Sequence, residues 1–211
     1  MIRSAILWMI VSYFIGSFPT AYVVSRITRG IDIRSAGSGN VGAANVHRVI
    51  GRGWGVFVAV VDMLKGSLAI LITGIASTVT APWLLSLAGL AAVLGHNYPV
   101  WLKFKGGKGV ATTYGVVFFL YPYESFAVTL LSGAVWYAVM KGTLYVSLAS
   151  MTSLLSISLF FWMLGAPAPF ILVSFFLAIL SIYRHSSNIE RLKRGTENAV
   201  VDTPDLTKTG R

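Results

Sequence analysis

The chain has 211 residues, of which 55% are apolar and only 11% are charged, and its mean hydropathy is +0.74. Soluble domains carry roughly 25% charged residues, so this composition predicts an integral membrane protein. The absence of cysteine excludes disulfides, a thiolate nucleophile and cysteine-ligated zinc or iron–sulfur sites. The net charge is +10, and the Lys and Arg residues flank apolar runs. This position is better explained by membrane orientation and anionic substrates than by binding of nucleic acid.

Long apolar runs follow one another along the chain. A membrane helix needs about 20 apolar residues. We predict spans at about 4–25, 53–75, 82–101, 109–121, 123–140, 143–164 and 167–183. The first run is longer than the apolar core of a typical signal peptide, so we treat it as a span. The fourth predicted span, 109–121, would be only about 20 Å long as a helix, which is short for a membrane crossing. It either takes length from Gly106 and Gly107 or forms a re-entrant hairpin with the fifth span.

Positive charge lies on alternate connections between these spans. Fifteen of the 17 Lys and Arg residues fall in 26–52, 103–108, Lys141 and 184–211. With seven crossings, the positive-inside rule places these stretches and the C-terminus in the cytoplasm and the N-terminus outside. The sequence therefore predicts an all-α integral membrane protein with seven transmembrane helices. We expect one membrane domain over 1–195 and a polar, disordered cytoplasmic tail over 196–211.

The first basic stretch contains a glycine-rich segment, GSGNVGAANVHR, over 37–48. Its G-x-G-x-x-G spacing indicates dinucleotide binding only between a strand and a helix, and here it lies between two membrane spans. Glycine N–H groups can still approach an anion closely, with Ser and Asn side chains as neutral partners. An arginine adds a planar fork for phosphate. The candidate binding residues are Gly37, Ser38, Gly39, Asn40, Gly42, Asn45 and Arg48.

The second basic stretch ends the segment GHNYPVWLKFKGGKG over 95–109. It is not a Walker A loop, because Gly109 follows Lys108 where Ser or Thr would stand. Lysines and glycines that enter a helix place ammonium and N–H groups at its positive end, which suits phosphate. An anchor for membrane orientation would not need the glycines. The candidates here are His96, Lys105, Gly106, Gly107, Lys108 and Gly109.

Two further groups of polar residues stand out. His185 and Asn188, just after the last span, share a face if they lie on one helix. Glu190 would lie off that face, so we assign no role to its spacing from His185. Asp62 and Lys65 lie inside the second span, where each charge costs at least about 2.5 kcal/mol. At i, i+3 they can pair, and we expect a supporting role for them.

These segments resemble the bacterial membrane acyl-phosphate:glycerol-3-phosphate acyltransferase family (PlsY type), and the resemblance covers the chain to about residue 197. The motifs that carry it are GSGNVGAANVHR (37–48), DMLKG (62–66), GHNYPVWLKFKGGKG (95–109), YVSLAS (145–150) and YRHSSNIERLKRGTE (183–197). Ala44 departs from the family, which usually has Thr at this position, whereas the neighbouring Asn45 is retained.

The resemblance implies seven helices in the bacterial cytoplasmic (inner) membrane and an active site that faces the cytoplasm. It also implies that acyl phosphate and sn-glycerol 3-phosphate react to 1-acyl-glycerol 3-phosphate and inorganic phosphate, without a cofactor or metal. Membrane lipids would surround the protein. Two phosphorylated substrates need two anion subsites, and either His185 or a substrate phosphate could take the proton. The predicted catalytic residues are Ser38, Arg48, Lys108, His185 and Asn188.

Other functions remain open at this stage. A transporter for a small organophosphate would also place basic groups near helix breaks, but it needs a polar path through the bilayer. A lipid-binding scaffold would not need three clusters of Gly, Asn and His. A CDP-alcohol transferase would require clustered aspartates for metal, which the sequence lacks. Acyl-chain preference and oligomeric state do not follow from the sequence.

Overall fold

The computed structural model describes residues 2–77 and 81–199, and every regular element in this part of the chain is a helix. The predicted tail beyond Ala199 lies outside the described residues. The helices are α1 (Ile2–Gly16), α2 (Thr20–Arg29), α3 (Ala43–Val49), α4 (Arg52–Ala76), α5 (Pro82–Asn97), α6 (Val110–Leu120), α7 (Pro122–Thr143), α8 (Val146–Met163), α9 (Ala168–Arg184) and α10 (Ser186–Lys193), with 3-10 turns η1 (Ile33–Ser35) and η2 (Val100–Leu102).

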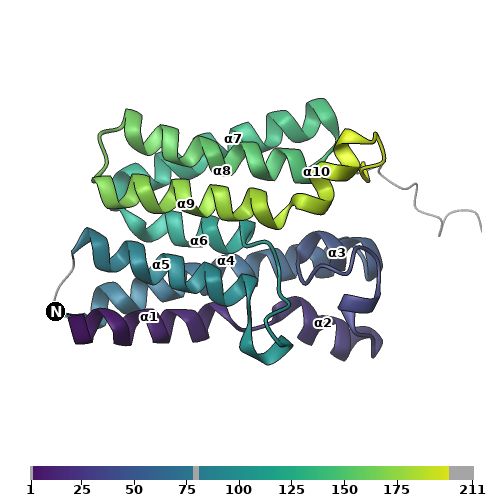
Figure 1. Ribbon diagram of the computed structural model, residues 1–211, viewed down its shortest axis with the longest axis horizontal. Coiled ribbons are helices and arrows are strands. Elements are labelled where there is room, and N and C mark those ends of the chain that lie inside the picture. Colours follow the sequence, from purple (N-terminus) through teal and green to yellow (C-terminus); the bar gives the residue numbers. More distant parts are fainter. Residues whose placement is uncertain (1, 78–80, 200–211) are drawn as a thin grey trace, which may run out of the picture.

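The long helices lie side by side along one axis (Figure 1). Helix α1 packs on α5, α4 packs on α6, and α8 lies between α7 and α9. Small residues allow close approach between helix backbones, as is common in membrane bundles. A Cβ on Gly115 of α6 would lie 1.8 Å from the carbonyl oxygen of Met63 in α4, and one on Gly66 would lie 2.3 Å from that of Thr112.

The outer surface of the bundle is apolar. Large hydrophobic side chains such as Val60, Leu64 and Leu68 of α4 are exposed, which suits contact with lipid rather than water. Within the described part of the chain, three stretches are long and apolar enough to cross a membrane: Ala5–Arg29, α4 and α8. Helices α9 and α10 count as a fourth if the bent pair is taken as one span. The predicted all-helical class is confirmed, and the number of seven crossings stays a prediction.

Two predicted spans differ from the observed helices. The first is interrupted at Ser17–Pro19, because Pro19 has no N–H to donate to the preceding turn. The chain then continues as α2 to Arg29. The fourth is only the 11-residue α6, and it takes no length from Gly106 and Gly107. The N–H groups of these two glycines bind the carbonyls of Asn97 and His96 instead of forming a helical turn.

The last predicted span, 167–183, agrees with α9, and the chain bends directly after it. Helix α9 ends at Arg184, and α10 leaves at an angle of 60° with His185 at the joint. This bend brings α10 toward α3 and the segment before α6. As Figure 1 shows, α2, α3 and α10 gather at one end of the bundle. Most of the basic residues belong to the segments at this end, as the charge pattern predicted.

Candidate active site

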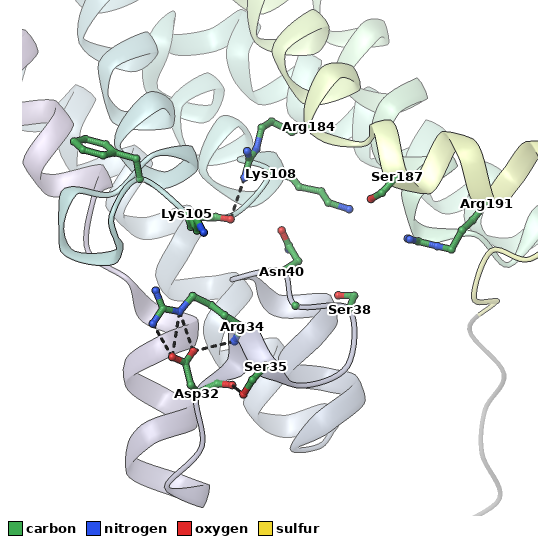
Figure 2. A pocket seen from close by; sticks show the side chains of 13 residues that line it. Asp32, Arg34, Ser35, Ser38, Asn40, Lys105, Lys108, Arg184, Ser187 and Arg191 are labelled. Carbon is green, nitrogen blue, oxygen red and sulfur yellow. Dashed lines mark hydrogen bonds and ion pairs between the residues drawn. The ribbon is translucent and has the colours of Figure 1, made fainter.

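A cavity of about 610 Å³ opens at the basic end of the bundle. Its walls come from three segments far apart in the sequence: 32–40, 104–108 and 184–191 (Figure 2). The cationic residues among those that line it are Arg34, Lys105, Lys108, Arg184 and Arg191. They face a single carboxylate among the lining residues, that of Asp32. The excess of positive charge makes the cavity a site for anions.

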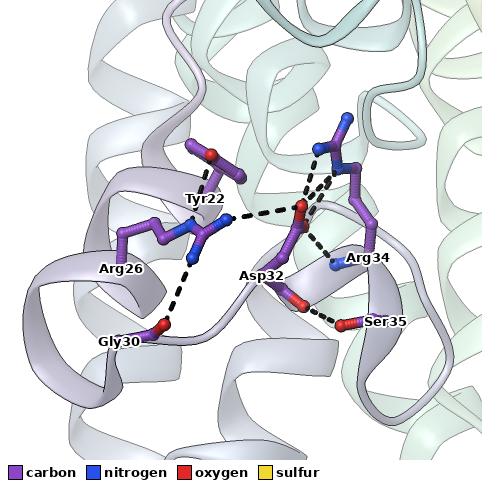
Figure 3. Close-up of polar contacts among 6 residues, drawn as sticks. All are labelled: Tyr22, Arg26, Gly30, Asp32, Arg34 and Ser35. Carbon is purple, nitrogen blue, oxygen red and sulfur yellow. Dashed lines mark hydrogen bonds and ion pairs between the residues drawn. The ribbon is translucent and has the colours of Figure 1, made fainter.

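The Asp32 carboxylate is neutralised by its own neighbours (Figure 3). It accepts hydrogen bonds from Arg34 Nη2 at 2.6 Å and from the Arg34 backbone N–H at 3.0 Å, and Arg26 lies 3.9 Å away. Both guanidinium groups also lie 5.4 Å from the centre of the Tyr22 ring. The side-chain hydrogen bond from Arg34 lowers the pKa of Asp32 to about 2, so this carboxylate cannot serve as a base near pH 7.

Asn45 shapes the glycine-rich loop. Its side chain is fully buried. Its Oδ1 accepts the Ser38 N–H at 2.9 Å, and its Nδ2 donates to the carbonyls of Ile33, Ala36 and Asn40 at 3.0–3.2 Å. These bonds engage both hydrogens of Nδ2, so Asn45 has a clear role in shaping the loop, and its predicted substrate contact stays a prediction. The loop in turn leaves Ser38 and Asn40 on the cavity wall.

The glycines contribute backbone shape more than hydrogen-bond donors. Gly37, Gly39 and Gly109 have left-handed φ values of 58°, 71° and 79°, which glycine adopts without strain. However, the N–H groups of Gly39, Gly42, Gly106 and Gly107 all bind backbone carbonyls within the fold. In this structure these four N–H groups are satisfied within the fold, and their predicted binding of phosphate stays a prediction. Anion binding falls mainly to the side chains.

Lys108 lies at the centre of the site and joins two of the predicted clusters. Its ammonium donates a hydrogen bond to Asn188 Oδ1 on α10. Burial lowers the pKa of Lys108 to about 8, and the cations Arg191, Arg184 and Arg48 act in the same direction. Lys108 is still mostly protonated at pH 7. Two of the predicted catalytic residues, Lys108 and Asn188, are thus in direct contact, and their catalytic roles stay a prediction.

Glu197 completes this network, although the sequence patterns placed it in the polar tail. Its carboxylate accepts hydrogen bonds from Asn188 Nδ2 at 2.6 Å, Ser147 Oγ at 2.9 Å and Arg191 Nε at 2.8 Å. The segment that begins at Thr196 is thus packed against the site as far as Glu197. The sequence signal for Glu197 was its position at the end of the last family-like motif, three residues after Arg194.

His185 is buried at the joint between α9 and α10, beyond the predicted span 167–183. Its Nδ1 lies 2.8 Å from the Ser181 carbonyl oxygen. A carbonyl can only accept, so Nδ1 carries the proton and Nε2 is the free acceptor. Burial, with the charge of Lys108, lowers the pKa of His185 to about 4. The imidazole is therefore neutral at pH 7.

Several predicted residues lie elsewhere. Arg48 on α3 is exposed and does not line the cavity, although its charge affects Lys108. Ala44 is also exposed and lies outside the cavity wall. His96 points away from the cavity, and its Nδ1 lies 3.7 Å from Asp62. The predicted pairing of Asp62 with Lys65 is confirmed at 2.7 Å.

Three arginines on the cavity wall, Arg34, Arg184 and Arg191, were not predicted as site residues. Arg184 donates from Nε and Nη2 to the carbonyls of Gly107 and Gly106, both at 3.1 Å, and its guanidinium lies 5.0 Å from the Tyr98 ring centre. Arg191 bonds to Glu197. Arg184 and Arg191 looked like positive charges that merely orient the last span, because sequence spacing does not show which way they face.

The fold and the cavity together define a helical membrane protein with an anion-binding site at one end. A family model described as glycerol-3-phosphate acyltransferase matches residues 6–195. The chain belongs to this family, and it is an acyltransferase.

Relatives and solved structures agree with this assignment. The glycerol-3-phosphate acyltransferase of Aquifex aeolicus is 43% identical over 194 residues, 92% of this chain and 98% of that protein. The enzyme of Desulforudis audaxviator is also 43% identical, over 89% of this chain and 91% of its own. Crystal structures of PlsY, an integral membrane glycerol 3-phosphate acyltransferase, are similar as well. Its glycerol 3-phosphate form has a TM-score of 0.87 at 42% identity and covers 94% of this chain and 96% of that chain, and its lysophosphatidic acid form has a TM-score of 0.84.

Proposed function

We propose that this protein transfers a fatty acyl group from acyl phosphate to the sn-1 hydroxyl of glycerol 3-phosphate, giving lysophosphatidic acid and inorganic phosphate. The observation that carries the proposal is the cavity of about 610 Å³ with its five cationic side chains, one of which, Lys108, is hydrogen-bonded to Asn188. The glycerol 3-phosphate and lysophosphatidic acid forms of the similar PlsY structures support the acceptor and the product. The phosphorylated donor is supported by the excess of positive charge.

Each substrate brings one phosphate, so the cavity has to bind two. In Figure 2, Lys108 lies between Lys105 on one side and Arg191 on the other. We assign Lys105 and Ser38 to one phosphate, and Asn188 and Arg191 to the other, with Lys108 between them. Arg48 can contribute through its charge, but it needs a side-chain movement to reach the cavity.

The reaction then proceeds by direct transfer. The sn-1 hydroxyl oxygen attacks the acyl carbonyl carbon and forms the new ester bond, while the bond from that carbon to the phosphate oxygen breaks. The hydroxyl proton passes to a phosphate oxygen, whose second pKa near 6 suits this role. The Lys108 ammonium stabilises the developing negative charge. His185, with a pKa of about 4, is a weak base, and we assign it a positioning role through Nε2.

We further propose that the chain crosses the bacterial inner membrane seven times with its basic end in the cytoplasm. The alternation of basic connections with connections that contain no Lys or Arg supports this topology. The acyl chain would extend between helices into the bilayer, where each buried CH₂ contributes about 0.8 kcal/mol. Both substrates could then meet at the membrane surface.

The test uses purified protein in lipid bilayers with palmitoyl phosphate and glycerol 3-phosphate. We expect release of inorganic phosphate and formation of lysophosphatidic acid in equal amounts, with no transfer from the matched donor palmitoyl-CoA. Transfer from palmitoyl-CoA alone would contradict the proposed donor. Uptake of glycerol 3-phosphate into vesicles without acylation would instead support the transporter alternative.

A further inference from the structure

A cluster of buried charges lies behind the cavity, outside the groups assigned to the reaction. Asp62 Oδ1 accepts hydrogen bonds from Thr20 Oγ1 at 2.9 Å and Lys65 Nζ at 2.7 Å, and His96 Nδ1 lies 3.7 Å away. All four side chains are less than 9% exposed. They come from α2, α4 and α5, so the cluster ties three helices together.

The cluster also holds the interruption between α1 and α2. Lys65 Nζ donates to the carbonyl oxygen of Phe18 at 2.9 Å. This carbonyl lies in the non-helical link 17–19. A carbonyl freed by a helix break inside a membrane needs another donor. Lys65 therefore fixes the position of the break relative to α4.

On its other side the cluster reaches the segment that carries Lys108. The His96 carbonyl accepts the Gly107 N–H at 3.1 Å. The His96 ring lies directly against Gly107, since a Cβ there would be 2.1 Å from His96 Nε2. Gly107 is bonded to Lys108, and its carbonyl is held by Arg184. A shift of His96 would consequently move the backbone that presents Lys108.

We propose that Asp62, Lys65 and His96 form a positioning cluster that sets the place of Lys108 in the cavity. The charges fix the His96 ring, the ring fixes Gly107, and Gly107 fixes Lys108. The three residues act through Lys108 and do not touch a substrate. The inference concerns the same site as the proposed function and rests on it for the kinetic readout.

The experiment compares two paired variants in the same helix interface. Asp62→Asn/Lys65→Met removes both charges at similar volume, and replacing a buried ion pair in this way is often neutral for stability. Ser12→Ala/Thr73→Val is the matched control. It removes a buried polar pair between α1 and α4, 3.4 Å apart, that has no connection to His96. Thermal unfolding establishes that each protein is folded.

We expect the charge-pair variant to remain folded and to lose at least about tenfold in kcat/KM, because small displacements of a catalytic group are costly. The increase in melting temperature caused by inorganic phosphate should also shrink, whereas the control keeps both values. A charge-pair variant with wild-type kcat/KM and phosphate response would overturn the inference.

A second variant, His96→Gln, leaves the Asp62–Lys65 pair in place and removes only the ring that packs on Gly107. We expect the same two losses. If this variant and the charge-pair variant both fail to fold while the control folds, the cluster is purely structural and the inference is wrong. The phosphate response is measured without acyl donor. An inactive wild-type protein would therefore contradict the proposed function but still leave the positioning inference open to this readout.

Discussion

Lys108 and Asn188 are 80 residues apart in the sequence, and the ammonium of the first donates a hydrogen bond to the amide oxygen of the second. This bond joins the segment before α6 to α10 at the centre of the cavity. The Asn188 amide is oriented by Glu197, which accepts from its Nδ2 at 2.6 Å. An amide can accept from a lysine through its oxygen and donate to a carboxylate through its nitrogen at the same time.

Substitution Asn188→Asp tests this orientation. The new carboxylate would face Glu197 and compete with phosphate for Lys108. Because hydrogen bonds to charged groups contribute about 1.5–3 kcal/mol, we expect a loss of roughly 10–100-fold in kcat/KM in the acyl-transfer assay. The control is Glu190→Gln on the same helix, an exposed residue whose carboxylate pairs only with Arg194. Equal activity of the two variants would contradict the role of Asn188.

The pKa of Lys108 near 8 predicts the alkaline limb of the pH profile. Below pH 8 the side chain is mainly an ammonium and binds phosphate, and above pH 8 it progressively loses its charge. We expect the KM for glycerol 3-phosphate to rise between pH 8 and 9.5. Lys108→Arg should flatten this rise whatever its effect on the rate, since arginine stays charged. An unchanged alkaline limb in Lys108→Arg would assign it to another group.

Glu197 gives a prediction about the length of the chain that the enzyme needs. A protein that ends at Ala199 keeps every described contact of Glu197, whereas one that ends at Gly195 loses the bonds to Ser147, Asn188 and Arg191. We expect near-normal turnover for the first and at least a tenfold loss for the second, from a loss of roughly 1.5–3 kcal/mol in charged hydrogen bonds. Equal turnover would show that Glu197 is dispensable.

The sequence predicted which end of the bundle holds the site. It did not predict the partners of the glycine N–H groups or the roles of Arg184 and Glu197 inside the site. The positions of Lys and Arg indicated the basic end, and the family-like motifs identified Lys108, His185 and Asn188 as candidates for one site. The glycine pattern suggested N–H donors for a ligand. In the structure, the N–H groups of Gly106 and Gly107 bind carbonyls at the C-terminal end of α5, and the glycine spacing does not encode where that helix ends. Arg184 and Glu197 were missed for a similar reason. Their partners come from distant segments, and no local spacing encodes those contacts.

Helix packing predicts which glycines tolerate a methyl group. Gly115→Ala places a Cβ 1.8 Å from the Met63 carbonyl oxygen, so α4 and α6 have to separate. Such overpacking costs about 1–3 kcal/mol, and we expect the melting temperature to fall by several degrees. Gly133→Ala in α7 meets nothing within 4 Å and should be neutral or slightly stabilising. A stable Gly115→Ala variant would contradict the close packing of α4 and α6.

His185→Ala separates two proposals for the proton acceptor. With a pKa of about 4 the imidazole is a weak base, so we expect substrate phosphate to accept the proton. Turnover of the variant should then fall by less than about 10⁴-fold, as for the loss of a positioning group. A larger loss, together with a shift of the acid limb of the profile, would identify His185 as the base.

The central claim is that acyl transfer occurs in the cavity around Lys108. The most direct measurement is phosphate release from palmitoyl phosphate, dependent on glycerol 3-phosphate, by Lys108→Ala and by the matched variant Lys103→Ala. Lys103 belongs to the same basic segment but is exposed and does not line the cavity. We predict a loss of about 10²–10³-fold for Lys108→Ala and less than about threefold for Lys103→Ala. Comparable rates for the two folded variants would contradict the account.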